Sequence, residues 1–198
     1  MRLFLIRHGE SEANRLEMYA GQTDVPLSDK GREDALSIKP ILEKFKFDKI
    51  YSSDLKRAVE TFEIAMPNME CEKTRLIREI DVGILTGKYI EDMKREYGEL
   101  FNKNRSVYNY KPFKGEAPED VAKRGAEFLT MLEDKPYKNV AAFCHAAFSC
   151  IMLGHITGTT ENLDKKALIC NNCAINIFEF DGEKWRLLCW NYGCDLTK

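Results

Sequence analysis

The sequence has no excess of charge of either sign. Its 30 lysines and arginines are matched by 32 aspartates and glutamates, so the formal net charge of the 198-residue chain is -2. A protein that is drawn to nucleic acid or to an anionic membrane by its overall field carries a basic excess, and this chain has none. We therefore expect neither partner, and an anionic ligand must be held by a local cluster of cationic side chains.

Long apolar runs are also missing. The run near the N-terminus, Leu3 to Ile6, has only four residues, which is too short for the core of a signal peptide. The longest stretch without Asp, Glu, Lys or Arg covers residues 139–160, and two histidines, a serine and two glycines interrupt it. It predicts a buried strand followed by a buried helix rather than a membrane span.

Cysteine is not arranged as a disulfide framework. The seven cysteines are an odd number, and they are scattered along a chain that is long enough to bury a large core. This usage is typical of a reducing compartment. Together with the lack of a signal peptide, it predicts a soluble protein of the cytoplasm.

Strand-like and helix-like segments alternate up to about residue 155, and a β-hairpin that turns at Asp181-Gly182 follows at residues 176–190. This order predicts an α/β fold, a three-layer αβα sandwich with a mostly parallel central sheet and a C-terminal β-hairpin, in a single domain over residues 1–198. Residues 101–114 have no clear period and predict a functional or mobile loop, whose basic and tyrosine side chains, Tyr108 and Tyr110 among them, form either a substrate lid or a solvated loop. The expected strands before the hairpin are residues 3–6, 49–51, 76–77 and 140–144, and the expected helices are residues 28–42, 54–65, 89–97, 118–132 and 147–153.

Arginine, histidine and glutamate side chains follow the predicted strands. Arg7 and His8 follow the first strand, Arg57 lies beyond the second, Glu79 follows the third and His145 follows the fourth. Open α/β proteins bind ligands at the carboxyl ends of their strands, so we expect these side chains to meet. Guanidinium groups fit phosphate oxygens, a neutral imidazole is a nucleophile that needs no separate base, and a carboxylate can protonate a leaving oxygen. The set predicts phosphate chemistry.

Spaced motifs extend this pattern over nearly the whole chain. They are RHGES at residues 7–11 with Asn14, GQTDVPLSDKG at 21–31, SSDLKRAVET at 52–61, REIDVG at 78–83, Gly115-Glu116 with Arg124, and the strand that leads to His145. In this order they resemble the histidine phosphatase superfamily, which has the phosphoglycerate-mutase-like fold. The resemblance is to the short phosphatase branch, which includes α-ribazole phosphatases and broad phosphomonoesterases. It implies hydrolysis of a small phosphorylated metabolite without a metal or another cofactor.

The resemblance also implies a role for each matching residue. His8 would be phosphorylated, and Glu79 would be the general acid and base. Ala146-Ala147 stands where the family commonly has Gly-Gly, which keeps the backbone N–H groups but narrows the backbone angles available. The transferring phosphoryl group would be held by Arg7, Arg57, His145 and the amide of Ala146, and the pocket would be lined by Asn14, Gly21, Gln22 and Thr23.

Three alternatives concern the same residues. Asp81 is a rival for the acid, because side chains two apart on an extended chain point to the same side as Glu79. A cofactor-dependent phosphoglycerate mutase would use the same His8, but those mutases are longer and carry Glu-Arg-His-Tyr-Gly where this chain has EIDVG. A catalytically inactive phospholigand-binding module on this fold would need neither the nucleophile nor the acid.

Two metal sites are the remaining alternatives. His8, Glu10 and His145 fit a two-histidine, one-carboxylate iron pattern, but such oxygenases are usually all-β and the pattern leaves the arginines unexplained. Cysteines near the C-terminus weakly resemble a zinc ribbon, but the second pair is spaced five apart, so buried thiols are the preferred interpretation. The four cysteines concerned are Cys170, Cys173, Cys189 and Cys194.

Overall fold

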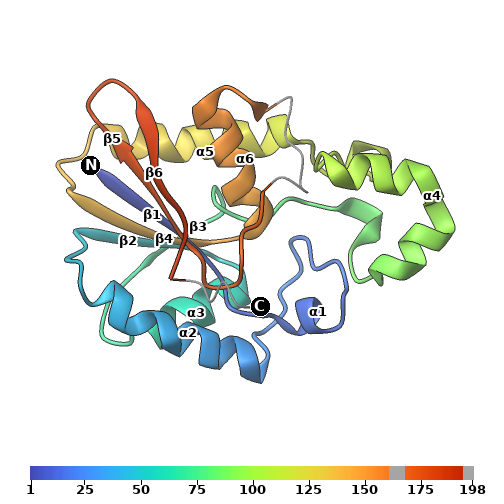
Figure 1. Cartoon of the computed structure of the whole chain (residues 1–198), viewed down its shortest axis with the longest axis horizontal. Coiled ribbons are helices and arrows are strands. Elements are labelled where there is room, and N and C mark those ends of the chain that lie inside the picture. The colour runs from blue at the N-terminus through green and yellow to red at the C-terminus, as the bar shows by residue number, and fades with distance from the viewer. Residues whose placement is uncertain (161–167, 194–198) are drawn as a thin grey trace.

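A twisted sheet forms the middle layer of the protein (Figure 1). In the computed structural model, which describes residues 1–160 and 168–193, the sheet has six strands in the order β3-β2-β4-β1-β5-β6. Strands β1 to β4 run parallel to one another, whereas β5 pairs antiparallel with β1 and forms a hairpin with β6. The strands are β1 (Arg2–Arg7), β2 (Lys49–Ser53), β3 (Glu72–Thr74), β4 (Asn139–Cys144), β5 (Ile175–Phe180) and β6 (Trp185–Tyr192).

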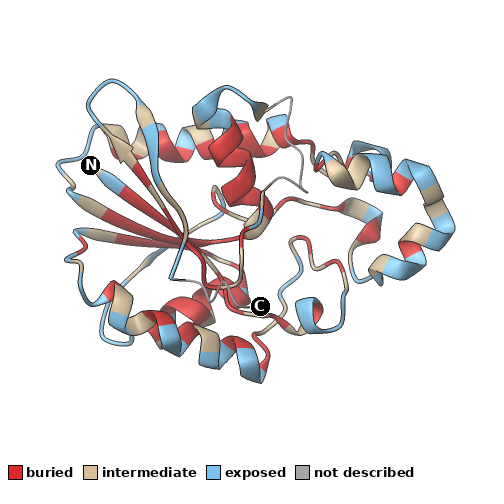
Figure 2. Ribbon diagram, in the orientation of Figure 1, coloured by how far each residue is buried: buried red, intermediate tan, exposed pale blue. Residues whose placement is uncertain are grey.

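Helices cover both faces of the sheet, and the buried residues lie along the strands and on the helix faces turned toward them (Figure 2). Phe4 and Ile6 of β1 pack on the side of α2 and α3, while Leu3 and Leu5 pack on the side of α5 and α6, because successive strand side chains point to opposite faces. The three layers, the mostly parallel sheet and the hairpin confirm the predicted fold. The helices are α1 (Glu12–Arg15), α2 (Asp29–Leu42), α3 (Lys56–Ala65), α4 (Ile90–Ser106), α5 (Pro118–Glu133) and α6 (Ala146–Thr157).

Local sequence signals start the helices that border the sheet. The Ser28 side chain accepts a hydrogen bond from the Gly31 N–H at 3.0 Å and so caps α2, which continues through Pro40 as one helix. Pro118 is the first residue of α5, where its missing N–H costs nothing. Within the described residues, every helix is too short or too polar to cross a lipid bilayer.

The prediction of a strand at residues 76–77 is wrong. The strand in this region, β3, lies at residues 72–74, and Leu76 and Ile77 follow it in a turn. The Leu76 N–H donates to the Thr74 hydroxyl, and its carbonyl accepts a hydrogen bond from Arg124. The backbone N–H and carbonyl groups of Leu76 thus form their hydrogen bonds with side chains instead of with a neighbouring strand. Ile77 is apolar because it packs into the core.

The prediction of a loop over the whole of residues 101–114 is also wrong. The first helical stretch of α4 ends at Gly98, where the sequence predicts a helix end and where φ is 52° and ψ is -125°, but a second stretch continues to Ser106. A short 3₁₀ helix, η2 (Lys111–Phe113), follows. The bend shifts the helical phase, so the apolar residues on its two sides do not share one period. Phe101 is fully buried and packs with the ring of Phe113.

Candidate active site

The carboxyl ends of the central strands border a cavity of about 170 Å³. Arg7, the last residue of β1, is in register with Cys144, the last residue of β4, so His8 and His145 leave the sheet side by side. Their ring centroids lie 5.2 Å apart at an interplanar angle of 62°. Parallel pairing of β1 with β4 is therefore what brings together two histidines that are 137 positions apart in the chain (145 minus 8).

His8 is held in one tautomer by its own backbone neighbour. Its Nδ1 lies 2.6 Å from the carbonyl oxygen of Gly9, which can only accept, so Nδ1 carries the proton. Nε2 therefore bears the lone pair, and it accepts a hydrogen bond of 3.1 Å from Nε of Arg57. Burial, followed by the charges of Arg57 and Arg7, lowers the pKa of His8 well below 6.5. The imidazole is thus neutral at physiological pH, with its nucleophilic nitrogen inside the site.

Arg57 reaches the site from the first turn of α3. Its side chain is 1% exposed, and its two terminal nitrogens donate to the carbonyl oxygens of Thr23 at 2.9 Å and Gly21 at 2.8 Å. Burial lowers the pKa of Arg57 to about 10, so that the guanidinium remains charged at neutral pH. The loop that contains Gly21 and Thr23 thus orients the arginine through its backbone. Gly21 also lines the cavity, whereas the Thr23 side chain points outward and is exposed.

Arg7 is the second cation of the cavity. One terminal nitrogen of its guanidinium donates to the carbonyl oxygen of Cys170 at 2.6 Å, which anchors the side chain beside His8. Its Nε is buried and has no hydrogen-bond partner among the described residues. Two guanidinium groups therefore lie around the nucleophilic nitrogen of His8, and each is anchored by backbone carbonyls.

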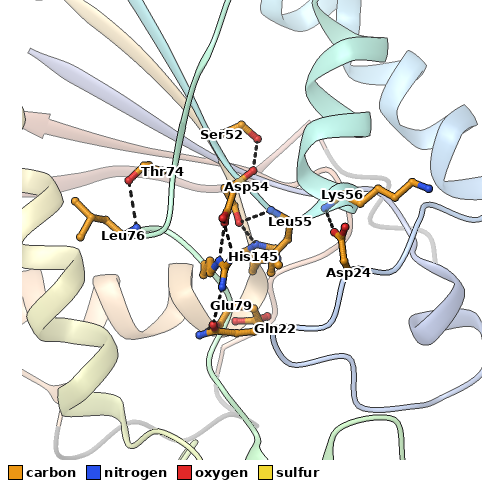
Figure 3. Close-up of polar contacts among 12 residues, drawn as sticks. Gln22, Asp24, Ser52, Asp54, Leu55, Lys56, Thr74, Leu76, Glu79 and His145 are labelled. Atoms are coloured by element: carbon orange, nitrogen blue, oxygen red, sulfur yellow. Dashed lines mark hydrogen bonds and ion pairs between the residues drawn. The ribbon is translucent and has the colours of Figure 1, made fainter.

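The ring of His145 is bound by Ser53. Its Nε2 lies 2.9 Å from the Ser53 hydroxyl, and that hydroxyl accepts a hydrogen bond from the Leu55 N–H (Figure 3). A hydroxyl that accepts from this N–H can donate its own proton to Nε2, and in that arrangement the imidazole proton is on Nδ1. Nδ1 is buried and has no partner in residues 1–160 or 168–193. Burial, with the charge of Arg57 and the nearby His8, lowers the pKa of His145 well below 6.5, so this ring is a neutral donor.

Glu79 borders the cavity and lies at the N-terminus of α6. Its carboxylate accepts hydrogen bonds from the N–H groups of Ala147 at 3.3 Å and Phe148 at 3.1 Å. Anionic groups are stabilised at a helix N-terminus by these unpaired N–H groups and by the helix dipole. Asp81 is turned away from the cavity, since its carboxylate accepts from the Gly83 N–H at 2.8 Å.

The backbone of Glu79 is fixed by two further side chains. Its carbonyl oxygen accepts hydrogen bonds from Gln22 and Arg124, each at 3.1 Å. Gln22 in turn accepts from Arg78, whose guanidinium forms a two-point ion pair with Asp54 at 2.6 Å (Figure 3). Gln22 thus lies behind the carboxylate rather than in the cavity wall, where its amide positions the acidic residue.

Ala146 and Ala147 begin α6, and His145 precedes it as the residue before the first turn. Neither alanine has a positive φ, so alanine is unstrained where the family commonly has glycine. Ala146 and Asn14 both line the cavity. The Asn14 side chain accepts a hydrogen bond from the Ser11 N–H at 3.1 Å, which is part of the capping box at the start of the short helix α1.

The cavity also contains residues that the sequence analysis does not assign to the site. Tyr19, Tyr108 and Tyr110 line it, and the last two lie in the segment that the sequence predicts to be either a substrate lid or a solvated loop. Ser53 stands where a helix-capping residue is expected, yet its hydroxyl contacts His145. The signal for Ser53 is its position at the end of a strand beside the predicted site. Tyr19 has no such signal, and for Tyr108 and Tyr110 the sequence leaves the choice between a lid and a solvated loop open.

The groups considered as metal ligands have other partners in the structure. The Glu10 carboxylate accepts from the Ser28 hydroxyl at 2.8 Å and lies 3.5 Å from Lys30. Among residues 1–160 and 168–193, no three His, Cys, Asp or Glu side chains are grouped as metal ligands. Cys170 accepts a hydrogen bond from Asn176, and Cys194 lies outside the described residues.

Comparison with known proteins agrees with this geometry. A family model described as the histidine phosphatase superfamily (branch 1) matches residues 3–193. The chain is 30% identical to phosphoserine phosphatase 1 of Hydrogenobacter thermophilus, over 98% of this chain and 82% of that protein. It is 42% identical to a 2,3-bisphosphoglycerate-dependent phosphoglycerate mutase of Treponema denticola, but over only 50% of this chain and 43% of the mutase.

The fold comparison points the same way. The solved structure of the alpha-ribazole phosphatase from Shigella flexneri matches with a TM-score of 0.84 at 22% identity, over 98% of this chain and 97% of that one. The predicted fold, family and phosphatase class are confirmed by these matches. The family model matches nearly the whole chain, and the motifs and the sheet agree with it, so the chain belongs to the histidine phosphatase superfamily.

Proposed function

We propose that this protein is a phosphomonoesterase that transfers the phosphoryl group of a small ester to Nε2 of His8 and then to water. The observation that carries the proposal is the tautomer of His8. Its Nδ1 proton is bound by the Gly9 carbonyl, so the lone pair of Nε2 lies beside Arg57 in a cavity that also contains Arg7. A neutral nucleophile between two guanidinium groups suits attack on a phosphoryl group whose charge is spread over its oxygens.

In the first step, Nε2 of His8 forms a bond to phosphorus as the bond from phosphorus to the ester oxygen breaks. Glu79, in its protonated form, gives its proton to the leaving oxygen, so that an alcohol departs. In the second step water attacks phosphorus, the bond to Nε2 breaks, and the Glu79 carboxylate takes the proton from water. Arg7, Arg57 and the Nδ1–H of His145 hold the phosphoryl oxygens throughout, and they stabilise the charge of both transition states.

The proposed reaction assigns the acid to Glu79 rather than to Asp81. The Glu79 carboxylate borders the cavity, whereas that of Asp81 is engaged with the Gly83 N–H. Asn14 and Ala146, which also line the cavity, would contact the substrate. The cavity volume of about 170 Å³ favours a small metabolite, and the odd number of cysteines favours a cytoplasmic location.

The second candidate function is mutase-type transfer of the phosphoryl group to a second hydroxyl. The high identity to the treponemal mutase favours it, because both reactions would use His8. The match over only half of each chain, and the replacement of the mutase motif around Glu79, favour hydrolysis. An inactive phospholigand-binding module would explain the arginines but not a neutral His8 beside a carboxylate that borders the same cavity.

A phosphate-release assay tests the proposal. The wild-type protein should hydrolyse p-nitrophenyl phosphate and small phosphorylated metabolites in the presence of a chelator, with no 2,3-bisphosphoglycerate primer. His8→Asn should abolish turnover, while His155→Asn, a change at an exposed histidine on α6, should leave it unchanged. Phosphoglycerate isomerisation that needs the primer, without phosphate release, would support the mutase instead. Binding of phosphate esters without turnover would support the inactive module.

A further inference from the structure

The motif Gly115-Glu116 with Arg124 has no part in the proposed chemistry so far. The side chains of Glu116 and Arg124 form a half-buried ion pair, in which two guanidinium nitrogens lie 3.3 Å and 3.4 Å from the two carboxylate oxygens. Neither side chain is among the described residues that line the cavity. Any part that this ion pair plays in the reaction is therefore exerted through other residues.

Arg124 binds the backbone that leads to the proposed acid. From α5, its guanidinium donates to the carbonyl oxygen of Leu76 at 2.9 Å and to that of Glu79 at 3.1 Å. The guanidinium also lies 5.6 Å from the ring centroid of Phe148, whose N–H donates to the Glu79 carboxylate. One arginine thus contacts the backbone of the acidic residue and also a residue that binds its carboxylate.

Glu116 binds the same segment on the other side of Glu79. Its carboxylate accepts a hydrogen bond from the Asp81 N–H at 2.8 Å, and its own N–H donates to the Asp81 carbonyl at 2.9 Å. A Cβ at Gly115 would lie 2.4 Å from that carbonyl oxygen, so glycine is needed for this close approach. The ion pair therefore grips the segment of residues 76–81 both before and after the acid.

This segment needs such contacts, because residues 78–82 form neither a helix nor a strand. A ladder of backbone hydrogen bonds therefore does not fix the position of Glu79. A general acid has to lie within hydrogen-bond reach of the oxygen that it protonates, and a displacement of about 1 Å can lower the rate about 100-fold. The fixed fork of a guanidinium suits the task, since it can donate to several acceptors at once.

We propose that the Glu116–Arg124 ion pair is a positioning device for the general acid, and that it holds the Glu79 carboxylate at the N-terminus of α6, in reach of the leaving oxygen. Both members are positioning residues, because they act through Glu79. This inference rests on the proposed phosphomonoesterase function with Glu79 as its acid. An ion pair that only stabilises the fold would affect the hydrolysis of all esters alike.

Two esters with one ring each separate these roles. Benzyl phosphate has a leaving oxygen that needs a proton, whereas the leaving group of p-nitrophenyl phosphate is stable as an anion. Arg124→Met should lower kcat/KM about 10–100-fold for benzyl phosphate and much less for p-nitrophenyl phosphate. Glu116→Gln, a change of charge with little change of shape, should show the same pattern to a smaller degree. Lys123→Met, at the neighbouring exposed lysine of α5, is the matched control and should keep the wild-type ratio of the two esters.

A double variant tests whether the ion pair acts through the acid. Once Glu79→Gln has removed the proton donor, its position no longer matters. Glu79→Gln/Arg124→Met should therefore prefer p-nitrophenyl phosphate to the same extent as Glu79→Gln alone. Turnover of p-nitrophenyl phosphate also reports whether each variant is folded, and Glu116→Gln keeps the test decisive if Arg124→Met does not fold.

The possible failures of the two proposals differ. Equal losses for both esters in Arg124→Met and in Glu116→Gln would overturn the positioning role and leave the phosphomonoesterase function standing. A further preference for p-nitrophenyl phosphate when Arg124→Met is added to Glu79→Gln would also overturn it. If the wild type hydrolyses neither ester, the proposed function fails and the inference fails with it.

Discussion

The two histidines of the site share the tautomer that carries the proton on Nδ1, and in each of them one neighbouring oxygen accounts for it. A carbonyl group can only accept, so Gly9 places the proton of His8 on Nδ1 and leaves the lone pair on Nε2. A hydroxyl group that already accepts from the Leu55 N–H donates to His145, and it therefore leaves the proton of His145 on Nδ1. The same residue type thus provides a nucleophile in one position and a hydrogen-bond donor in the other.

Removal of the Ser53 hydroxyl should allow the imidazole of His145 to populate both tautomers. In Ser53→Ala, Nε2 loses its donor, so the proton should be shared between both nitrogens, and kcat/KM should fall about tenfold from the loss of one buried hydrogen bond. ¹⁵N NMR of histidine-labelled protein distinguishes the tautomers directly. Ser52→Ala is the control, because that hydroxyl donates to the Ser53 carbonyl and contacts neither ring. A His145 that keeps its Nδ1 proton in Ser53→Ala would refute this role.

Substitution of the acidic residue should depend on the leaving group. Glu79→Gln should lower kcat/KM about 10²–10⁴-fold for an alkyl phosphate, whose departing oxygen needs a proton. The loss should be much smaller for p-nitrophenyl phosphate, whose leaving group is stable as an anion. Asp81→Asn should show no such difference, since its carboxylate caps the Gly83 N–H. If the two variants exchange these behaviours, Asp81 is the acid.

At the scale of the elements, the sequence is sufficient where one local signal decides the structure. The apolar runs ending at Ile6 and Cys144 are strands because both faces of a parallel strand are buried. Ser28 and Pro118 mark helix starts that the structure shares. Arg7, His8, Arg57 and His145 follow the ends of predicted parallel strands, and for that reason the sequence alone predicts that they meet.

The segments that the sequence does not predict depend on contacts distant in the chain. Ile77 is apolar because it is in the core, and the hydrogen bond from Arg124 to Leu76 stands in for strand pairing. Gly98 bends α4, so no single helical period spans that helix. Tyr108 and Tyr110 follow this bent helix and line the cavity, and for that reason the sequence alone leaves open whether their segment is a lid or a solvated loop.

The bend in α4 should require glycine. The φ of 52° and ψ of -125° at Gly98 lie in a region that residues with a Cβ rarely occupy. Gly98→Ala should therefore lower the free energy of unfolding by about 1–3 kcal/mol, although the side chain itself would meet open space. Urea denaturation measures the change, with Glu99→Ala at the next, exposed position as the control. Equal stability of the two variants would show that the bend carries no strain.

At the scale of the whole molecule, the buried histidines link stability to pH. Burial first, and then nearby positive charge, lowers the pKa of His8 and of His145 well below 6.5. The unfolded chain therefore takes up protons before the folded one as the pH falls. The contribution of these groups to stability is complete above about pH 6.5 and is lost progressively below it.

A double variant should remove this dependence. Between about pH 7 and pH 5, the Tm of the wild type should fall more steeply than that of His8→Asn/His145→Asn, because asparagine does not titrate. Differential scanning calorimetry at a series of pH values measures both curves. His155→Asn, which changes an exposed histidine, should follow the wild type. Parallel curves for the wild type and the double variant would contradict the link.

The molecule as a whole has almost no net charge, and two of its arginines, Arg7 and Arg57, lie where strands of the sheet end. Two buried or half-buried arginines and two neutral histidines meet there within a chain of net charge -2. Recognition of a phosphate ester is therefore expected to be local, and association should depend only weakly on ionic strength. The proposed chemistry depends on one atom, Nε2 of His8.

Trapping the covalent intermediate tests that atom most directly. The protein is mixed with a radiolabelled phosphate ester, quenched within the first turnovers, hydrolysed in alkali and analysed by chromatography, which separates the two isomers of phosphohistidine. We predict label on Nε2 of His8 in the wild type, accumulation of that label in Glu79→Gln, and none in His8→Asn. Label on Nδ1 or on another residue, or wild-type turnover by His8→Asn, would contradict the proposed mechanism.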